Sequence, residues 1–141
     1  MISCTRKISF DSAHRLMTHE SNCKYLHGHR YVCEATFEAP QIDDLGMVID
    51  FSEIKKVLGD WIKQALDHNT ILSRNDTELA NSIEKHTHKK VYLLDSNPTA
   101  ENIALHILND ICPKLFKNHN VTCIRIRLHE SENSYVETSL K

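Results

Sequence analysis

The sequence predicts an α+β domain in which two long helices cover one face of a four-stranded antiparallel sheet. Segments with strand-like alternation occur as neighbouring pairs near both ends of the chain, and two long amphipathic segments lie between them. Sequential strands favour hairpins, and the apolar stripe of each helix needs a sheet face to cover. The predicted element order is ββαβαββ, or ββα(α)βαββ if a polar segment also forms a short helix.

The strands are predicted from alternation. Residues 2–12 (ISCTRKISFDS) and 30–39 (RYVCEATFEA) alternate between apolar and polar side chains and are rich in β-branched and aromatic residues. Val121–Leu128 alternates as well, and Ser134–Leu140 follows after a turn at Glu132-Asn133. The chain should therefore close with a hairpin.

The helices are predicted from apolar spacing. Asp50–Leu66 has the periodicity of an amphipathic helix. At Asn97-Pro98-Thr99, an N-cap followed by proline at the first helical position should open the second long helix, with apolar residues continuing to Leu115. Asp76–Lys85 is a weaker helical segment, and Lys90–Leu94 is expected to be a short strand.

Length and composition indicate one domain over residues 1–141, since only three glycines and three prolines occur and no linker or repeat is evident. The formal net charge of −2 gives no reason to expect nucleic acid or a membrane as a partner. No apolar run has the length of a membrane span, and the N-terminus does not resemble a secretory signal. A cytoplasmic location is expected.

Five cysteines, an odd number without a C-x-x-C pair, favour free thiols in a reducing compartment. Ten histidines are the unusual feature of the composition. In His27-Gly28-His29 the two imidazoles would point to the same side of a strand, because residues i and i+2 share a face. An antiparallel partner strand would bring His14 beside them. Three histidines with an open fourth position are typical of catalytic zinc.

Less specific interpretations remain for each motif. A lone H-x-H is more often a pair of solvent-facing histidines, and Cys23 lies where it would complete a closed structural zinc site with the three histidines. Asp67-His68 ends the first helix, where a histidine is favoured by the helix dipole, although the pair also suits proton transfer. Glu130 by itself is most simply a solvated strand end.

Six short motifs, in order along nearly the whole chain, resemble the 6-pyruvoyl-tetrahydropterin synthase / 6-carboxy-tetrahydropterin synthase family, and the likeness is closest to its bacterial 6-carboxy branch. The resemblance implies the tunnelling fold, in which four-stranded sheets trimerise into a β-barrel and two trimers stack into a homohexamer. It also implies active sites at subunit interfaces. The motifs are Phe10-Asp11-Ser12-Ala13-His14, Cys23-x-x-x-His27-Gly28-His29, Asp50-Phe51, Leu66-Asp67-His68-Asn69, Asn97-Pro98-Thr99-Ala100-Glu101-Asn102 and Glu130.

Residue roles follow from the resemblance alone. His14, His27 and His29 match the family's zinc ligands, with one Zn²⁺ per chain that acts as a Lewis acid on the substrate.

Cys23 matches the catalytic cysteine, and Asp67 and His68 match the residues that tune and relay its proton. Glu130 matches the anchor that accepts two hydrogen bonds from a pterin, and Thr99 would contribute to the same pocket.

The implied activity is a zinc-dependent carbon-carbon lyase that converts 7,8-dihydroneopterin triphosphate to 6-carboxy-5,6,7,8-tetrahydropterin, for 7-deazaguanine and queuosine synthesis. Acetaldehyde and triphosphate would be released. The alternatives are a 6-pyruvoyl-tetrahydropterin synthase, a non-catalytic zinc-stabilised pterin-binding module, and a metal-free aldolase that would leave the histidines without a role. The candidates to bind the triphosphate are Arg15, Lys24 and Arg30. The polar stretch 73–90 is longer than is usual in the family, so it departs from the usual spacing of the motifs.

Overall fold

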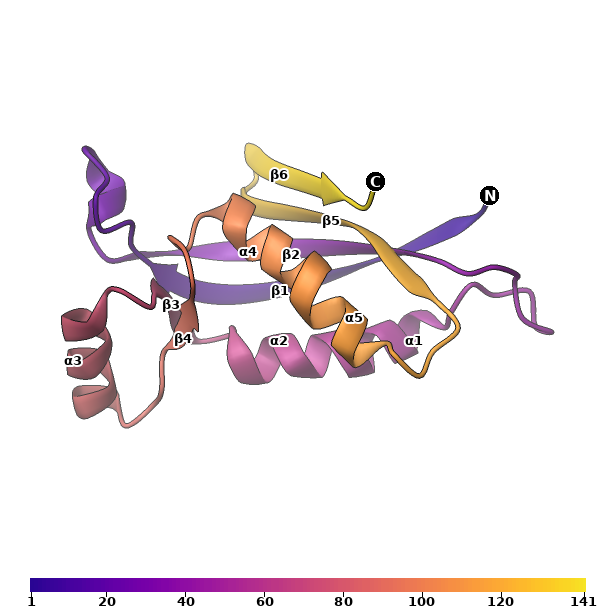
Figure 1. The fold of residues 1–141 in the computed structure, drawn as a ribbon, viewed down its shortest axis with the longest axis horizontal. Helices are drawn as coiled ribbons and strands as arrows, with labels where there is room; N and C mark the ends of the chain where they lie inside the picture. The colour runs from indigo at the N-terminus through magenta and orange to yellow at the C-terminus, as the bar shows by residue number, and fades with distance from the viewer.

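The computed structural model describes residues 1–141 and contains a six-stranded sheet with strand order β4-β3-β1-β2-β5-β6 (Figure 1). Strands β1, β2, β5 and β6 form the predicted antiparallel set of four, while β3 and β4 extend the sheet in parallel beyond β1. The prediction of four strands was therefore wrong in number. The strands are β1 (Ser3–His14), β2 (His27–Glu38), β3 (Asn69–Ser73), β4 (Tyr92–Leu94), β5 (Thr122–Ser131) and β6 (Ser134–Ser139).

Strand β3 was not predicted because it is short and largely buried. Its five residues, NTILS, leave little room for alternation, and its last three are all buried. Only the final residues of β1, Ser12–His14, pair with it. The added strands therefore lie beside the end of β1 that carries His14.

Two long helices are each built from three consecutive pieces, with a π-helical turn in the middle. The first agrees with the predicted Asp50–Leu66, and the Asp50 side chain caps it by accepting the Ser52 N–H at 2.8 Å. No helix is both long and apolar enough to cross a membrane. The pieces are α1 (Phe51–Ile54), η2 (Lys55–Gly59) and α2 (Asp60–Ala65), then α4 (Ala100–His106), η3 (Ile107–Ile111) and α5 (Cys112–Leu115); shorter helices are η1 (Asn22–Lys24) and α3 (Thr77–Thr87).

The predicted start of the second long helix was wrong by two residues. Thr99, and not Asn97, is the N-cap: its backbone is extended and its hydroxyl accepts the Asn102 N–H at 3.1 Å. Ala100 is the first helical residue, so Pro98 lies before the cap instead of inside the first turn. The hydroxyl of Thr99 satisfies a free helical N–H, which is the usual reason for threonine at this position.

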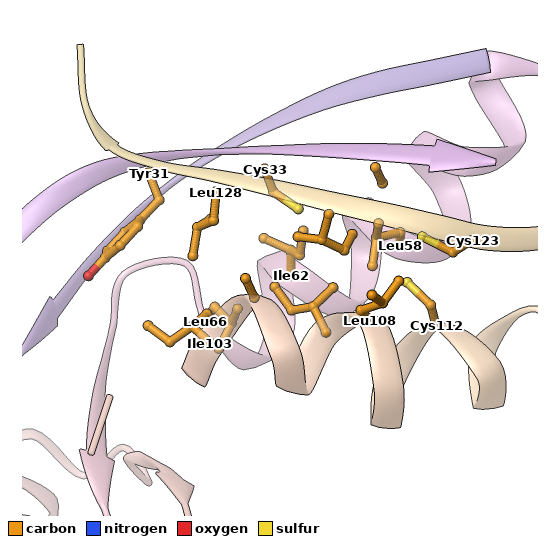
Figure 2. Close-up of a cluster of buried hydrophobic side chains, with 14 of the residues drawn as sticks. Tyr31, Cys33, Leu58, Ile62, Leu66, Ile103, Leu108, Cys112, Cys123 and Leu128 are labelled. Atoms are coloured by element: carbon orange, nitrogen blue, oxygen red, sulfur yellow. The ribbon is translucent and has the colours of Figure 1, made fainter. Parts of the chain in front are cut away.

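Both long helices cover the same face of the sheet, as predicted (Figure 1). Their inward side chains interlock with those of the sheet in one cluster of 21 buried residues. Figure 2 shows Leu58 and Ile62 from the first helix and Leu108 from the second beneath Cys33 and Leu128 of the sheet. This core fixes the ends of β1 and β2, where the histidines lie.

The opposite face of the sheet is mainly polar. Glu34 accepts a hydrogen bond from His129 at 2.6 Å and lies 3.8 Å from the Lys7 ammonium. Arg127 pairs with Glu137 at 2.7 Å. A face linked by ion pairs needs no apolar cover. The backbone edges left unpaired are β6 on one side of the sheet and residues 3–11 of β1 on the other.

Candidate metal centre and adjoining cavity

The three predicted histidines converge where β1 ends and β2 begins. In the antiparallel register, His14 lies opposite His27 and Ser12 lies opposite His29. One ring nitrogen from each histidine lies within 4.8 Å of the other two. Gly28 passes so near β1 that a Cβ there would stand 3.2 Å from the Ser12 carbonyl oxygen, which explains the glycine between the ligands. The predicted convergence is confirmed.

The hydrogen bonds of two imidazoles define which nitrogen faces the centre. His14 Nδ1 donates to the Pro98 carbonyl at 2.7 Å, and His27 Nδ1 donates to the Tyr25 carbonyl at 2.7 Å. Since a carbonyl oxygen can only accept, we assign the ring proton of each neutral imidazole to Nδ1 and the lone pair to Nε2. Metal-binding histidines are held by such partners on the second nitrogen.

The Nε2 atoms of His14 and His27 face each other at 3.2 Å. With both protons on Nδ1, this separation brings two lone pairs together, an arrangement that a cation between them would stabilise. Two ligands of a tetrahedral zinc ion, each at a Zn–N distance of roughly 2.0–2.1 Å, stand about 3.3 Å apart. The spacing of the two nitrogens therefore fits zinc.

His29 supplies the clearest sign of a missing partner. Its Nε2 is buried and has no hydrogen bond, although the Glu130 carboxylate lies 3.3 Å away in an orientation that does not form one. A buried polar atom without a partner is costly unless something else satisfies it. Burial also lowers the pKa of His29 and of His14, which keeps both imidazoles in the neutral form that binds metal. The three residues fit a zinc ion.

Cys23 is not part of this ligand group. It lies on the η1 turn and is partly exposed, and the group of converging ligand atoms contains the three histidines alone. A closed four-ligand site would have required the Cys23 sulfur among them. The geometry therefore favours a centre with an open position over the structural site.

A cavity of about 300 Å³ adjoins the centre and brings together four of the predicted residues: His14, Cys23, Thr99 and Glu130. They come from four different elements, the end of β1, the η1 turn, the cap of α4 and the end of β5. Sequence reasoning missed the other walls, which include Glu101 and the β6 residues Ser134, Tyr135 and Val136. The short turn after Glu130, which folds β6 back beside it, was the signal for the three β6 residues.

The Asp67-His68 pair forms as predicted but lies outside this cavity. Asp67 Oδ1 accepts the Asp11 N–H at 2.9 Å, and its other oxygen lies 3.0 Å from His68 Nδ1. Burial acts to raise the pKa of Asp67, but the hydrogen bonds from Asp11 and His68 outweigh it and the pKa is lowered. The His68 side chain is 77% exposed. Within one chain, the pair is not brought to Cys23.

The three basic candidates are used differently. Arg15 donates from Nε at 2.6 Å to Asp76, which is buried, so it links β1 to the start of α3. Arg30 pairs with Asp11 at 3.1 Å on the sheet surface. Lys24 has no carboxylate partner and follows Cys23 directly. Arg15 is therefore paired with a carboxylate inside the fold, while the charge of Lys24 is not neutralised by a carboxylate.

The fold is shared with solved structures of low sequence similarity. An uncharacterized protein of Wolinella succinogenes superimposes with a TM-score of 0.82 at 18% identity, over 99% of this chain and 98% of that one. The 6-pyruvoyl tetrahydropterin synthase of Caenorhabditis elegans superimposes with a TM-score of 0.71 at 19% identity, over 99% and 96%. These likenesses establish the fold.

Sequence comparison gives the family. Residues 3–140 match the 6-pyruvoyl tetrahydropterin synthase family. The 6-carboxy-5,6,7,8-tetrahydropterin synthase of Rickettsia bellii is 50% identical over 137 residues, which cover 97% of this chain and 99% of that protein. The enzyme of that name from Haemophilus influenzae is 29% identical over 143 residues, covering 97% and 98%. The chain belongs to the 6-pyruvoyl tetrahydropterin synthase family and is a lyase-type enzyme, as the motifs indicated.

Proposed function

We propose that the chain is a zinc-dependent 6-carboxy-tetrahydropterin synthase. It converts 7,8-dihydroneopterin triphosphate and one water molecule to 6-carboxy-5,6,7,8-tetrahydropterin, acetaldehyde and triphosphate, as a step toward 7-deazaguanine and queuosine. The observation that carries the proposal is the cavity in which Cys23 and Glu130 share walls with His14 of the three-histidine centre. The names of the Rickettsia and Haemophilus relatives support this branch of the family.

One zinc ion per chain would be held by His14, His27 and His29. When bound, it supplies Lewis acidity to the oxygens of the substrate side chain and so acidifies the neighbouring C–H groups. The chain's part is to hold the three nitrogens in place: the carbonyl partners of His14 and His27 fix those two rings before the metal arrives.

Glu130 is suited to anchor the pterin. A carboxylate accepts two parallel hydrogen bonds from the pterin amide N–H and exocyclic amino group, which form a paired donor edge. Its Oε1 lies 3.3 Å from His29 Nε2, so a pterin held by Glu130 would place its side chain beside the metal centre. Thr99 lines the same cavity from the cap of α4.

Cys23 is the candidate proton carrier because it is the cavity's thiol and stands apart from the ligands. Proton transfer by a positioned group requires a partner that restores its protonation state. Asp67 and His68 suit that role, but in one chain they lie outside the cavity. We propose that Asp67 and His68 of the partner subunit complete each site in a homohexamer made of two trimers.

The 6-carboxy and 6-pyruvoyl branches of the family differ in the product they form. Only three residues separate Cys23 from His27, and the Tyr25 carbonyl binds the His27 ring within this short loop. Reaction rates depend steeply on placement of the reacting groups, so a short tether restricts which side-chain carbon the sulfur reaches. We expect cleavage between the first and second side-chain carbons, and not formation of 6-pyruvoyl-tetrahydropterin.

The test is to incubate the purified protein with 7,8-dihydroneopterin triphosphate, trap volatile aldehyde and identify the pterin by mass. One acetaldehyde per 6-carboxy-tetrahydropterin is expected. Stoichiometric 6-pyruvoyl-tetrahydropterin without acetaldehyde would assign the chain to the other branch. Zinc binding with no turnover of the substrate would instead support the non-catalytic module.

A further inference from the structure

The turn at residues 97–99 contacts both the metal centre and the cavity. The Pro98 carbonyl accepts the His14 Nδ1 proton at 2.7 Å, while Thr99, the next residue, lines the cavity. The position of one peptide group therefore affects how His14 presents its other nitrogen. The hydrogen bonds that hold this turn in place therefore also determine the orientation of the metal ligand His14.

Asn102 holds the turn with two hydrogen bonds. Its side-chain nitrogen donates to the Asn97 carbonyl at 2.9 Å, and its backbone N–H donates to the Thr99 hydroxyl at 3.1 Å. The Asn97 carbonyl also accepts the Thr99 N–H at 2.8 Å. Pro98 has no N–H of its own to contribute. The Asn102 amide is therefore the side-chain donor that fixes the residues flanking Pro98.

The His14 ring has little freedom to compensate if the turn moves. The residue is 2% exposed, and the Tyr31 hydroxyl, itself fully buried, lies 3.3 Å from the same Nδ1. If the Pro98 carbonyl withdrew, the buried ring proton would lose its close acceptor and keep only the more distant Tyr31 hydroxyl, or the ring would turn to follow the carbonyl. Rotation would move Nε2 away from the position opposite His27, and loss of the acceptor would leave the ring less firmly oriented.

We infer that Asn102 is a positioning residue for the metal ligand His14 and acts through the Pro98 carbonyl. The chain of contacts runs from the Asn102 amide to the Asn97 carbonyl, along the turn to Pro98, and from there to His14. The inference rests on the proposed zinc site. It assigns to the asparagine of the Asn97–Asn102 motif a task distinct from capping the helix, which its backbone N–H and Thr99 perform.

The informative variant is Asn102→Asp. Aspartate has the same shape and keeps the backbone N–H, and a negative charge in the first turn of a helix is favourable, so the helix should persist. A carboxylate cannot donate to the Asn97 carbonyl and is repelled by it. The matched control is Asn109→Asp, the same substitution at an exposed position further along the same long helix, where the side chain makes no hydrogen bond.

Three measurements separate positioning from folding: the zinc Kd against a competing chelator, the visible spectrum of the Co²⁺-substituted protein, and the Tm with and without zinc. For Asn102→Asp we expect zinc affinity to fall about 10-fold, the lower end of the range for groups that orient a ligand. The Co²⁺ bands should shift, and the gain in Tm on adding zinc should shrink while the Tm of the metal-free protein stays near wild type. Asn109→Asp should match wild type throughout.

A zinc Kd for Asn102→Asp equal to wild type would overturn the inference. So would a fall in Tm of the same size with and without zinc, because that result describes a residue that acts on the fold alone. Failure of the proposed function looks different: wild-type protein would then bind no zinc at the histidines, and the inference would fall with it. Tight zinc binding by wild type and Asn102→Asp alike removes only the role of Asn102.

Discussion

The three histidines of the site differ in the hydrogen bonds that their ring nitrogens make. The Nδ1 atoms of His14 and His27 are bound to backbone carbonyls, whereas the buried Nε2 of His29 has no hydrogen bond. Spacing in the sequence was enough to predict that the three rings meet. The carbonyls that orient them, from Pro98 and Tyr25, were not predictable, because a backbone acceptor has no residue-type signature.

The metal ligands can be tested one at a time. His27→Ala or His29→Ala removes one of three ligands and should reduce bound zinc from about one per chain to a small fraction. Metal analysis after gel filtration measures this. His86→Ala, at an exposed histidine on α3, is the control and should keep its zinc. Full retention of zinc in both ligand variants would remove the assignment.

A variant of Cys23 distinguishes a catalytic zinc centre from a structural zinc site. Cys23→Ala should retain zinc and stability yet lose turnover by a factor of about 100 or more, since it removes the proposed proton carrier and no ligand. Zinc content, Tm and rate are measured on the same preparation. Cys4→Ala, at the far end of β1, should leave zinc content and rate unchanged. Joint loss of metal and stability in Cys23→Ala would favour the closed four-ligand site.

The proposed role of Glu130 is tested by the affinity of the protein for a pterin. In Glu130→Gln the amide accepts one hydrogen bond and turns a donor toward a donor, so pterin affinity should fall by about 10-fold or more. Titration with a non-reactive pterin, followed by fluorescence, provides the measurement. Glu132→Gln in the adjoining turn is the control. Unaltered pterin affinity in Glu130→Gln would place the anchor elsewhere.

At the scale of elements, the long periodic segments were predictable, and so were α3 near Asp76–Lys85 and the short strand β4 within Lys90–Leu94, but β3 was not. The two long helices and four antiparallel strands follow from spacing that repeats over many residues, while β3 has only five. The strands also extend further than their alternation indicated: β1 ends at His14 and β2 begins at His27, so the histidines lie within the sheet. The cap at Thr99 was misplaced because both Asn97 and Thr99 are residue types that cap helices.

Packing of the second long helix provides the stability test at this scale. Leu108 is 1% exposed within the main core, so Leu108→Ala should destabilise the fold by about 2–5 kcal/mol through lost burial and the cavity left behind. Leu105, on the same helix, is 42% exposed, and its alanine variant should change stability by no more than about 0.5 kcal/mol. Urea unfolding compares the two. Equal effects would contradict the orientation of the helix.

At the scale of the whole molecule, one chain does not contain a complete proposed site. Cys23 lines the cavity, while His68 is exposed elsewhere. The unpaired edges at β6 and at residues 3–11 of β1 are where strands of neighbouring copies would add, because ring closure leaves no edge free. A sequence describes one chain, so the proposed assembly and the proposed sharing of sites come from the family resemblance alone.

Mixed oligomers test whether sites are shared. Cys23→Ala and His68→Ala should each be inactive alone, but chains of both kinds assembled together should regain up to about a quarter of wild-type activity, since some interfaces combine two intact residues. Sedimentation should show a hexamer, or at least a multiple of three. No recovery in verified mixed oligomers, or an active monomer, would contradict the shared site.

Removal and return of the metal tests the central claim most directly. Zinc is stripped from the wild-type protein with a chelator, and acetaldehyde release from 7,8-dihydroneopterin triphosphate is measured as zinc is titrated back. We predict negligible release from the stripped protein and a linear rise that ends at one zinc per chain, because three histidines from each chain form one centre. Full acetaldehyde release by metal-free protein would contradict a zinc-dependent site built on His14, His27 and His29.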